Sequence, residues 1–346
     1  MGSYRTRCGN CTPAAYEAHL KATGGCAKPG PKCTGPTSIK MECSPPSSPP
    51  PEDNGLRGWP RQDRRRILHV VYRVGDIEKS MKWYEDCLGM QILRKRDVPD
   101  EKYMNVFMGY GMEDNHTTVE FTYNYGVTKY DLGAAFGHFG IAVTNVQKAL
   151  DAIKKKGYKT PAGPTKERNE VCAFLEDPDG YKVKLIQRKN SREPFCQLSY
   201  RVADVDRSIL FHQDVYGMKL LARKDYPKDK KTFAYVAYDM DETRSTVLEF
   251  EYNYGKTDYP KGTGYAQLAI GTEDVYKTAG ATELLGGKTV RPPGALPKFN
   301  TKIYSNEDLD GWKTVWVDNE DFARELEPAS FTHQVKCTTR NDRQHL

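Results

Sequence analysis

The sequence predicts an α+β fold of four βαβββ units, arranged as two tandem domains. Residues 72–97 align without gaps to residues 200–225, with ten identities in 26 positions, and the motif YNYG occurs once in each half. Each half divides again, because a short apolar strand opens four separate units. These opening strands are HVVYRV at 69–74, HFGIAV at 138–143, QLSYRV at 197–202 and QLAIGT at 267–272.

A helix is predicted after each opening strand, because a capping residue precedes each candidate helix and a glycine follows it. Two or three β-rich runs come next, such as 103–110 and 117–123 in the first unit. Paired units with curled mixed sheets are therefore expected to enclose a cleft. The predicted N-cap residues are Asp76, Asn145, Asp204 and Thr272.

Composition divides the chain into an extension and a folded body. Residues 1–65 are rich in proline and cysteine and show no sustained period, which predicts disorder. We expect one domain at 66–190, a second at 195–325 and a tail at 326–346. A half zinc site at Cys8 and Cys11, a myristoylated Gly2 and a transit peptide are alternative roles for the extension.

The overall balance of residues predicts a soluble globular protein. The 346 residues are 38% hydrophobic and 28% charged, with a net charge of +6 and no apolar run as long as a membrane span. Basic residues alternate with acidic ones, which argues against nucleic-acid binding. Five of the nine cysteines lie in the extension and the others lack paired spacing. These cysteines favour a reducing compartment.

Equivalent positions in the four units carry candidate metal ligands. Period-2 alternation places one residue of each first strand and one of each last strand at the same point. Neutral imidazoles and carboxylates at such matched positions suit zinc, nickel or iron. The first-strand residues are His69, His138, Gln197 and Gln267, and the last-strand residues are Glu120, Lys184, Glu249 and Val315.

These motifs resemble one enzyme family. Segments RILHVVYRVGD, VEFTYNYGV, FGHFGIAV and FLEDPDGYKVKLIQR, followed by CQLSYRVAD, LEFEYNYG, YAQLAIGTEDVYKTA and DLDGWKTVWVDN, are similar to the two-domain plant glyoxalase I, a lactoylglutathione lyase of the vicinal oxygen chelate superfamily. The resemblance covers residues 66 to about 325. It implies one nickel or zinc ion, glutathione as co-substrate, and conversion of the methylglyoxal hemithioacetal to S-lactoylglutathione through a metal-stabilised enediolate.

The resemblance also assigns roles to residues. It implies His69, Glu120 and His138 as metal ligands, with Gln197 and Glu249 at the equivalent positions of the second half, and it makes Glu120 and Glu249 candidate catalytic carboxylates. Arginine and lysine suit the two free carboxylates of glutathione. The implied substrate contacts are Arg73, Asn124 and Lys166, with Arg201 and Asn253 repeating two of them.

Lys184 departs from the family pattern, which has a glutamate there as fourth ligand and proton-transfer base. A site within the first half would contain His69, Glu120, His138 and Lys184. Sites across the halves would contain either Gln197, Glu249, His138 and Lys184, or His69, Glu120, Gln267 and Val315. Every arrangement lacks a base at that position, unless Glu176 or Glu251 reaches in, the alignment slips or the deduced sequence is in error. Loss of a base predicts a weakened enzyme.

Three functions are therefore compared. The first is a lactoylglutathione lyase, the second a catalytically impaired homologue that binds metal and glutathione, and the third an iron-dependent dioxygenase. The third needs two histidines and one glutamate together. We further expect a monomer, because the duplication supplies the unit pairs within one chain. The expected location is the cytoplasm or plastid, and the expected partner is a small-molecule substrate.

Overall fold

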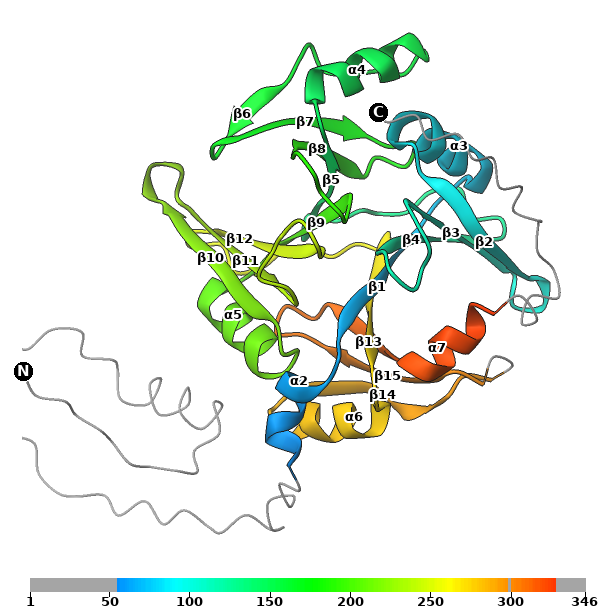
Figure 1. The fold of residues 1–346 in the computed structure, drawn as a ribbon, viewed down its shortest axis with the longest axis vertical. Helices are drawn as coiled ribbons and strands as arrows, with labels where there is room; N and C mark the ends of the chain where they lie inside the picture. The colour runs from blue at the N-terminus through cyan, green and yellow to red at the C-terminus, as the bar shows by residue number, and fades with distance from the viewer. Residues whose placement is uncertain (1–54, 298–299, 328–346) are drawn as a thin grey trace, which may run out of the picture. The chain divides into compact units, whose positions relative to one another are not determined.

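A computed structural model describes residues 55–297 and 300–327, all of which belong to one compact unit (Figure 1). The N-terminal cysteines and the tail beyond residue 327 lie outside this range. Four βαβββ units follow one another. They are β1 (Arg66–Arg73), α3 (Ile77–Leu88), β2 (Gln91–Val98), β3 (Tyr103–Gly109) and β4 (Thr118–Asn124); β5 (Phe136–Val143), α4 (Val146–Lys155), β6 (Thr165–Glu167), β7 (Glu170–Glu176) and β8 (Lys182–Gln187); β9 (Phe195–Arg201), α5 (Val205–Asp214), β10 (Lys219–Tyr226), β11 (Lys231–Ala237) and β12 (Val247–Asn253); β13 (Tyr265–Thr272), α6 (Val275–Leu284), β14 (Lys288–Ala295), β15 (Lys302–Glu307) and β16 (Lys313–Asp318).

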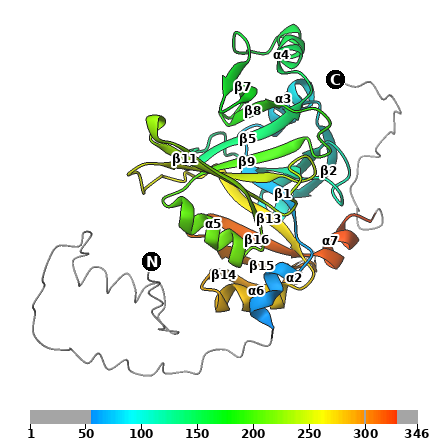
Figure 2. The same ribbon diagram turned by 60° about the vertical axis from the view of Figure 1, so that its left-hand side comes forward.

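The α+β fold with curled mixed sheets is confirmed, and each sheet combines one unit from each half of the chain (Figure 2). Sheet A has the order β14-β15-β16-β13-β1-β4-β3-β2, and sheet B has the order β10-β11-β12-β9-β5-β8-β7-β6. Antiparallel pairs join the units, β1 with β13 in sheet A and β5 with β9 in sheet B. The first unit therefore pairs with the fourth, and the second pairs with the third.

The strand register makes the four last-strand positions equivalent. In each unit, the residue two places after the first-strand position pairs with the last-strand residue. No alignment slip therefore moves Lys184 away from the position of Glu120 and Glu249. The four pairs are Val71 with Glu120, Gly140 with Lys184, Ser199 with Glu249 and Ala269 with Val315.

Capping side chains fix the starts of the helices. Asp76 and Asn145 each accept a hydrogen bond from the backbone three residues on, and Asp204 caps α5 in the same way, as predicted. The prediction for the fourth helix is wrong. Thr272 is the last residue of β13, and Asp274 accepts the backbone N–H bonds of residues 276 and 277 instead.

The folded body begins before the predicted boundary at residue 65. Residues 56–62 form the short helices η1 (Leu56–Gly58) and α2 (Trp59–Gln62), and Trp59 Nε1 donates to Thr278 on α6 at 2.9 Å. The buried Arg65 Nε donates to Asp63 at 2.7 Å, and its guanidinium lies 4.5 Å from the centre of the Trp316 ring. The sequence did not predict this buried Arg65–Asp63 ion pair, because charged residues and prolines dominate the segment and usually indicate exposed chain.

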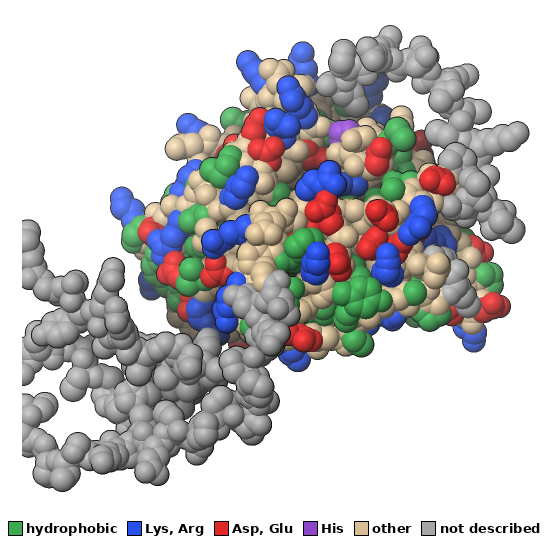
Figure 3. All heavy atoms as spheres, turned by 60° about the horizontal axis from the view of Figure 1, so that its bottom comes forward, with side chains coloured by type: hydrophobic (Ala, Val, Ile, Leu, Met, Phe, Trp, Pro, Cys, Tyr) green, Lys and Arg blue, Asp and Glu red, His purple; other side chains and the backbone are tan. Residues whose placement is uncertain are grey.

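Two further features concern the surface. Lys and Arg side chains are interspersed with Asp and Glu on the face drawn in Figure 3. Across the described residues, no helix combines the length and the apolar character that a membrane crossing needs. Helix α7 (Asn319–Glu325) follows the last strand and packs against β16.

One buried histidine predicts a pH dependence of stability. Burial lowers the pKa of His212 to about 4, although its Nδ1 donates to Ser208 O at 2.8 Å. The unfolded chain therefore binds an extra proton between about pH 6.5 and 4, so His212 should cost about 3 kcal/mol of stability as the pH falls through that window. In urea unfolding at several pH values, His212→Leu should reduce this loss; an unchanged slope relative to the natural chain would contradict the assignment.

Candidate active site

Three of the predicted ligands meet on sheet B. We define cluster B as His138, Lys184, Gln197 and Glu249. Gln197 Oε1 lies 3.4 Å from His138 Nε2, and Gln197 Nε2 donates to Glu249 Oε2 at 3.0 Å. Glu249 Oε1 accepts from Ser199 at 2.9 Å and lies 4.0 Å from His138 Nε2. Units two and three thus bring their donor atoms together.

Gly140 provides the space for this arrangement. It faces Gln197 across the β5–β9 pair, and a Cβ atom at residue 140 would approach Gln197 Cβ to 2.5 Å. Real Cβ contacts are never this short. A glycine on β5 is therefore required for the Gln197 side chain to lie beside His138.

Lys184 is completely buried within cluster B. Its side chain has 0% exposure, and Nζ donates to Glu170 Oε2 at 3.2 Å. Glu170 also lies 3.5 Å from Arg188. Neither acid proposed as a substitute base reaches this place, because Glu176 pairs with Lys182 and Glu251 pairs with Lys231 at 2.6 Å. The ammonium therefore has a carboxylate partner that the sequence analysis did not identify.

A second cation, Arg168, contacts Glu249 directly. Its Nη1 lies 3.0 Å from Glu249 Oε2 and 3.2 Å from the hydroxyl of Tyr235, and its guanidinium lies 3.8 Å from the centre of the Phe233 ring. Arg168 and Asn169 form the two-residue turn between β6 and β7, with φ angles of 48° and 73°. An asparagine in such a turn is a hairpin signal, so the turn was readable from sequence, but its contact with Glu249 was not.

The charges of cluster B are balanced without another ion. Burial lowers the pKa of His138 to about 4, and the cations Lys184 and Arg168 lower it further, against the opposing effect of Glu249. Burial alone would raise the pKa of Glu249, but the charges of Arg168 and Lys184 and the hydrogen bond from Ser199 outweigh it and the pKa is lowered. A neutral imidazole therefore lies beside an ionised carboxylate.

Sheet A contains the second set, cluster A, defined as His69, Glu120, Gln267 and Val315. His69 Nε2 lies 3.2 Å from Glu120 Oε2, and Asn105 donates to the other oxygen of this carboxylate. Both the histidine and the glutamate are buried. In the described parts of the chain no Lys or Arg forms an ion pair with Glu120, and His69 Nδ1 is buried without a hydrogen-bond partner.

The predicted substrate contacts are distributed over both sheets. Arg73 lies in sheet A and donates to Thr263 O at 2.7 Å. Arg201, its counterpart in sheet B, donates to Ala134 O at 2.6 Å and lies 3.6 Å from Glu251. Asn124 and Asn253 each donate to a tyrosine six residues on, at 2.8 and 2.9 Å. Lys166 is exposed on β6, at the edge of sheet B.

Two further cations accompany Arg73, and the sequence analysis missed both. Burial lowers the pKa of Lys313, and the neighbouring positive charges of Arg73 and Arg291 lower it further. Arg291 faces Ser305, which in turn faces Val315, and its Nε is buried without a hydrogen-bond partner. Within residues 55–297 and 300–327, none of the three cations pairs with a carboxylate. The repeat of DGYK as DGWK was a signal for Lys313, whereas nothing marked Arg291.

Lys313 has an acidic neighbour that is already engaged. Glu307 faces Lys313 across β15 and β16, but its carboxylate binds Lys288 at 2.6 Å. The equivalent lysine of sheet B, Lys182, pairs with Glu176. Sheet A thus presents three cations without an acidic partner in the described residues, whereas in sheet B Lys182 pairs with Glu176 and Arg201 shares Glu251 with Lys231.

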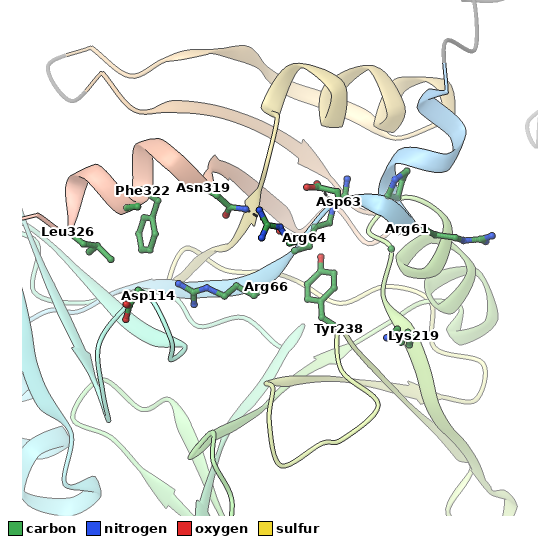
Figure 4. A pocket seen from close by; sticks show the side chains of 14 residues that line it. Arg61, Asp63, Arg64, Arg66, Asp114, Lys219, Tyr238, Asn319, Phe322 and Leu326 are labelled. Carbon is green, nitrogen blue, oxygen red and sulfur yellow. Dashed lines mark hydrogen bonds and ion pairs between the residues drawn. The ribbon is translucent and has the colours of Figure 1, made fainter.

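A separate cavity of about 600 Å³ lies between the 60–66 segment and α7 (Figure 4). None of the predicted site residues lines it. Its arginines are mostly paired, Arg61 with Asp214, Arg64 with Glu273 and Arg65 with Asp63. The cavity is therefore distinct from both clusters.

The two clusters differ in their fit to a divalent metal. Among the described residues no three His, Cys, Asp or Glu side chains converge on one point, so each cluster offers one histidine, one glutamate and one glutamine. In cluster A, His69 and Glu120 are buried and Gln267 is partly exposed, and among the described residues no Lys or Arg pairs with Glu120. His69 Nδ1 is buried without a hydrogen-bond partner. Nitrogen and oxygen donors of this kind fit nickel or zinc. Cluster B does not fit, because Lys184 and Arg168 already hold its positive charge.

Comparisons with known proteins show the family to which this chain belongs. Residues 66–185 and 195–315 each match the Glyoxalase/Bleomycin resistance protein/Dioxygenase superfamily. The lactoylglutathione lyase of Oryza sativa is 55% identical over 277 residues, which is 78% of this chain and 94% of that protein. The chain belongs to the lactoylglutathione lyase family. Lyases of this glyoxalase I family are metal-dependent and use glutathione.

Other relatives agree with this membership. The probable chloroplastic lactoylglutathione lyase of Arabidopsis thaliana is 55% identical over 274 residues, covering 79% of this chain and 78% of that protein. The crystal structure of glyoxalase I from Zea mays is 53% identical with a TM-score of 0.76, covering 80% of this chain and 99% of that one. A putative dioxygenase from Bacillus subtilis, 13% identical with a TM-score of 0.57, covers 73% of this chain and 84% of that one and shares the fold alone.

The contact between Arg168 and Glu249 predicts a stability difference within one hairpin of this lyase homologue. Removing the partner of a buried charge typically costs about 3–5 kcal/mol. Arg168→Ala should therefore lower the free energy of unfolding by an amount of this order in urea titrations. Lys166→Ala, an exposed change on the same hairpin, is the control and should change it by less than about 0.5 kcal/mol. Equal effects would show that Arg168 does not compensate Glu249.

Proposed function

We propose that cluster A is where this lactoylglutathione lyase homologue converts the hemithioacetal of methylglyoxal and glutathione to S-lactoylglutathione. The observation that supports this placement is the combination, on one sheet, of a cation-free His69–Glu120 pair with the unpaired cations Arg73, Arg291 and Lys313. Sheet B offers neither feature. Its histidine and glutamate have resident cations, and its equivalents of Arg73 and Lys313 have acidic partners.

The three cations suit the ends of glutathione. Arg73 follows Val71 by two residues, and Val71 faces Glu120; Lys313 precedes Val315 by two residues. Two residues of a strand span ~7 Å, so these charges lie within reach of a tripeptide whose sulfur is beside Glu120. The free carboxylates of glutathione would be received by guanidinium and ammonium groups that have no competing anion.

Glu120 is the carboxylate available for moving a proton between the two substrate carbons. His69 and Glu120 would hold one nickel or zinc ion, and such an ion polarises substrate oxygens. Val315 stands where the fourth unit would supply a second carboxylate, so only one of two acid–base groups remains. Loss of a positioned base typically lowers the rate by about two to four orders of magnitude, and we propose a weakened enzyme.

The second candidate is a homologue that binds glutathione without turnover. It is favoured by the apolar Val315 in cluster A and the cationic Lys184 in cluster B, since both replace a carboxylate. An extradiol-type dioxygenase is not supported, because His69 and His138 lie in different sheets and neither cluster contains two histidines. Activity on methylglyoxal and glutathione separates the first two candidates.

We also propose a monomer in the plastid or cytoplasm. Each sheet is completed by units of the same chain, so a partner subunit is not needed to supply donor atoms. The name of the Arabidopsis relative supports a plastid.

Introducing the missing carboxylate should increase turnover. We expect Val315→Glu to raise the rate of S-lactoylglutathione formation by at least about 100-fold in nickel- or zinc-loaded protein, because a glutamate there supplies the second acid–base group. Val315→Gln is the matched control, with similar size and no charge. Glutathione affinity, measured by calorimetry, checks that both variants retain the site. A high natural rate that Val315→Glu leaves unchanged would place the base elsewhere.

The cation set predicts a defect in binding. Arg291→Ala should raise KM for the hemithioacetal by roughly 10-fold with little change in kcat, because a charge-assisted hydrogen bond to a remote carboxylate contributes about 1.5–3 kcal/mol to ground state and transition state alike. Lys182→Ala, the equivalent of Lys313 in sheet B, should leave KM unchanged. The proposal fails if the sheet B variant is the one that weakens binding.

A further inference from the structure

Cluster B contains the family's donor types together with the buried Lys184, and the partly buried Arg168 contacts its glutamate. We propose that Lys184 and Arg168 occupy the electrostatic place of a divalent metal, so that cluster B is a metal-independent ion network that ties unit two to unit three. Lys184 stands at the fourth position of the set, and Arg168 contacts the carboxylate of Glu249 at 3.0 Å. The inference depends on the proposed function only in assigning the metal to cluster A.

The first argument is charge balance. The positive charges of Lys184 and Arg168 match the negative charges of Glu170 and Glu249, at 3.2 and 3.0 Å. Arg188 extends the network from Glu170 to Glu242, at 3.5 and 3.2 Å. A divalent ion beside His138 and Glu249 would add two positive charges to a set that is already neutral. Repulsion between like charges is strong where water is excluded.

The second argument is that both oxygens of Glu249 already accept hydrogen bonds from the protein. Glu249 is 1% exposed, and its two oxygens accept from Gln197, Ser199 and Arg168. A metal that bound both oxygens of this carboxylate would have to displace Arg168 from Oε2, and Arg168 is held against Phe233 and Tyr235 by the turn of the hairpin. Lys184 is fully buried, and its ammonium is already paired with Glu170.

The third argument is position in the fold. Arg168 and Glu170 lie on the β6–β7 hairpin of unit two, whereas Glu249 and its partner Ser199 belong to unit three. The Arg168–Glu249 contact therefore joins the two units of sheet B beyond their β5–β9 pair. A metal with ligands from both units would make the same connection.

The test is metal stoichiometry of the full-length chain after saturation with nickel and dialysis. The natural protein should retain one nickel ion, His69→Ala should retain none, and His138→Ala should still retain one. Loss of nickel on His138→Ala, or a second ion in the natural protein that His138→Ala removes, would overturn the inference. A natural protein that retains none would reject the metal assignment of cluster A and leave cluster B metal-independent, so the two proposals fail separately.

A gain-of-binding variant gives a second readout, and its matched control carries the same destabilising Arg168→Ala change. Lys184→Glu alone would set a new carboxylate against Glu170, so the triple variant Arg168→Ala, Glu170→Gln, Lys184→Glu is used. It should retain one more nickel ion than the natural chain. The control Arg168→Ala, Glu170→Gln, Lys184→Gln removes the same charges without adding a ligand and should retain no extra ion. Equal stoichiometry in both triple variants would show that the resident cations are not what excludes the metal.

Discussion

The two antiparallel strand pairs that join units from different halves determine which side chains meet. β1 pairs with β13 and β5 pairs with β9, so the first unit must share a sheet with the fourth and the second with the third. Backbone hydrogen bonds in these pairs lie at the centre of each eight-stranded sheet. The β5–β9 pair places His138 near Gln197, whereas His69 meets Glu120 through the parallel β1–β4 pair within unit one. The two histidines therefore lie in different sheets.

The sequence contained enough to predict the units and the equivalent positions. Period-2 alternation and the internal repeat assigned Glu120, Lys184, Glu249 and Val315 to one structural place, and the strand register agrees. The choice of partner unit was not predictable, because alternation fixes the face of a strand and not its neighbour. Both possible pairings had to remain open until the topology was known.

The contacts of Lys184 were beyond sequence reasoning for a different reason. Its partner Glu170 is close in sequence, but the direction of each side chain depends on the short hairpin between β6 and β7 and on the packing of Arg168 against Phe233. Long charged side chains can reach several partners from one backbone position. Glu176 and Glu251, the acids considered first, are taken by nearby lysines. Which carboxylate pairs with Lys184 therefore depends on which nearby acids are already paired with other lysines.

The union of both clusters in one chain has an evolutionary consequence. In a dimer of identical subunits, one codon specifies the same residue at both symmetric sites, so replacing a ligand glutamate by lysine would damage both together. Here residues 184 and 315 are encoded separately. One site can accept a substitution such as lysine and become a stabilising contact between two units, while the other remains under selection for catalytic activity. Gene duplication followed by fusion thus frees the copies to specialise inside a single folded body.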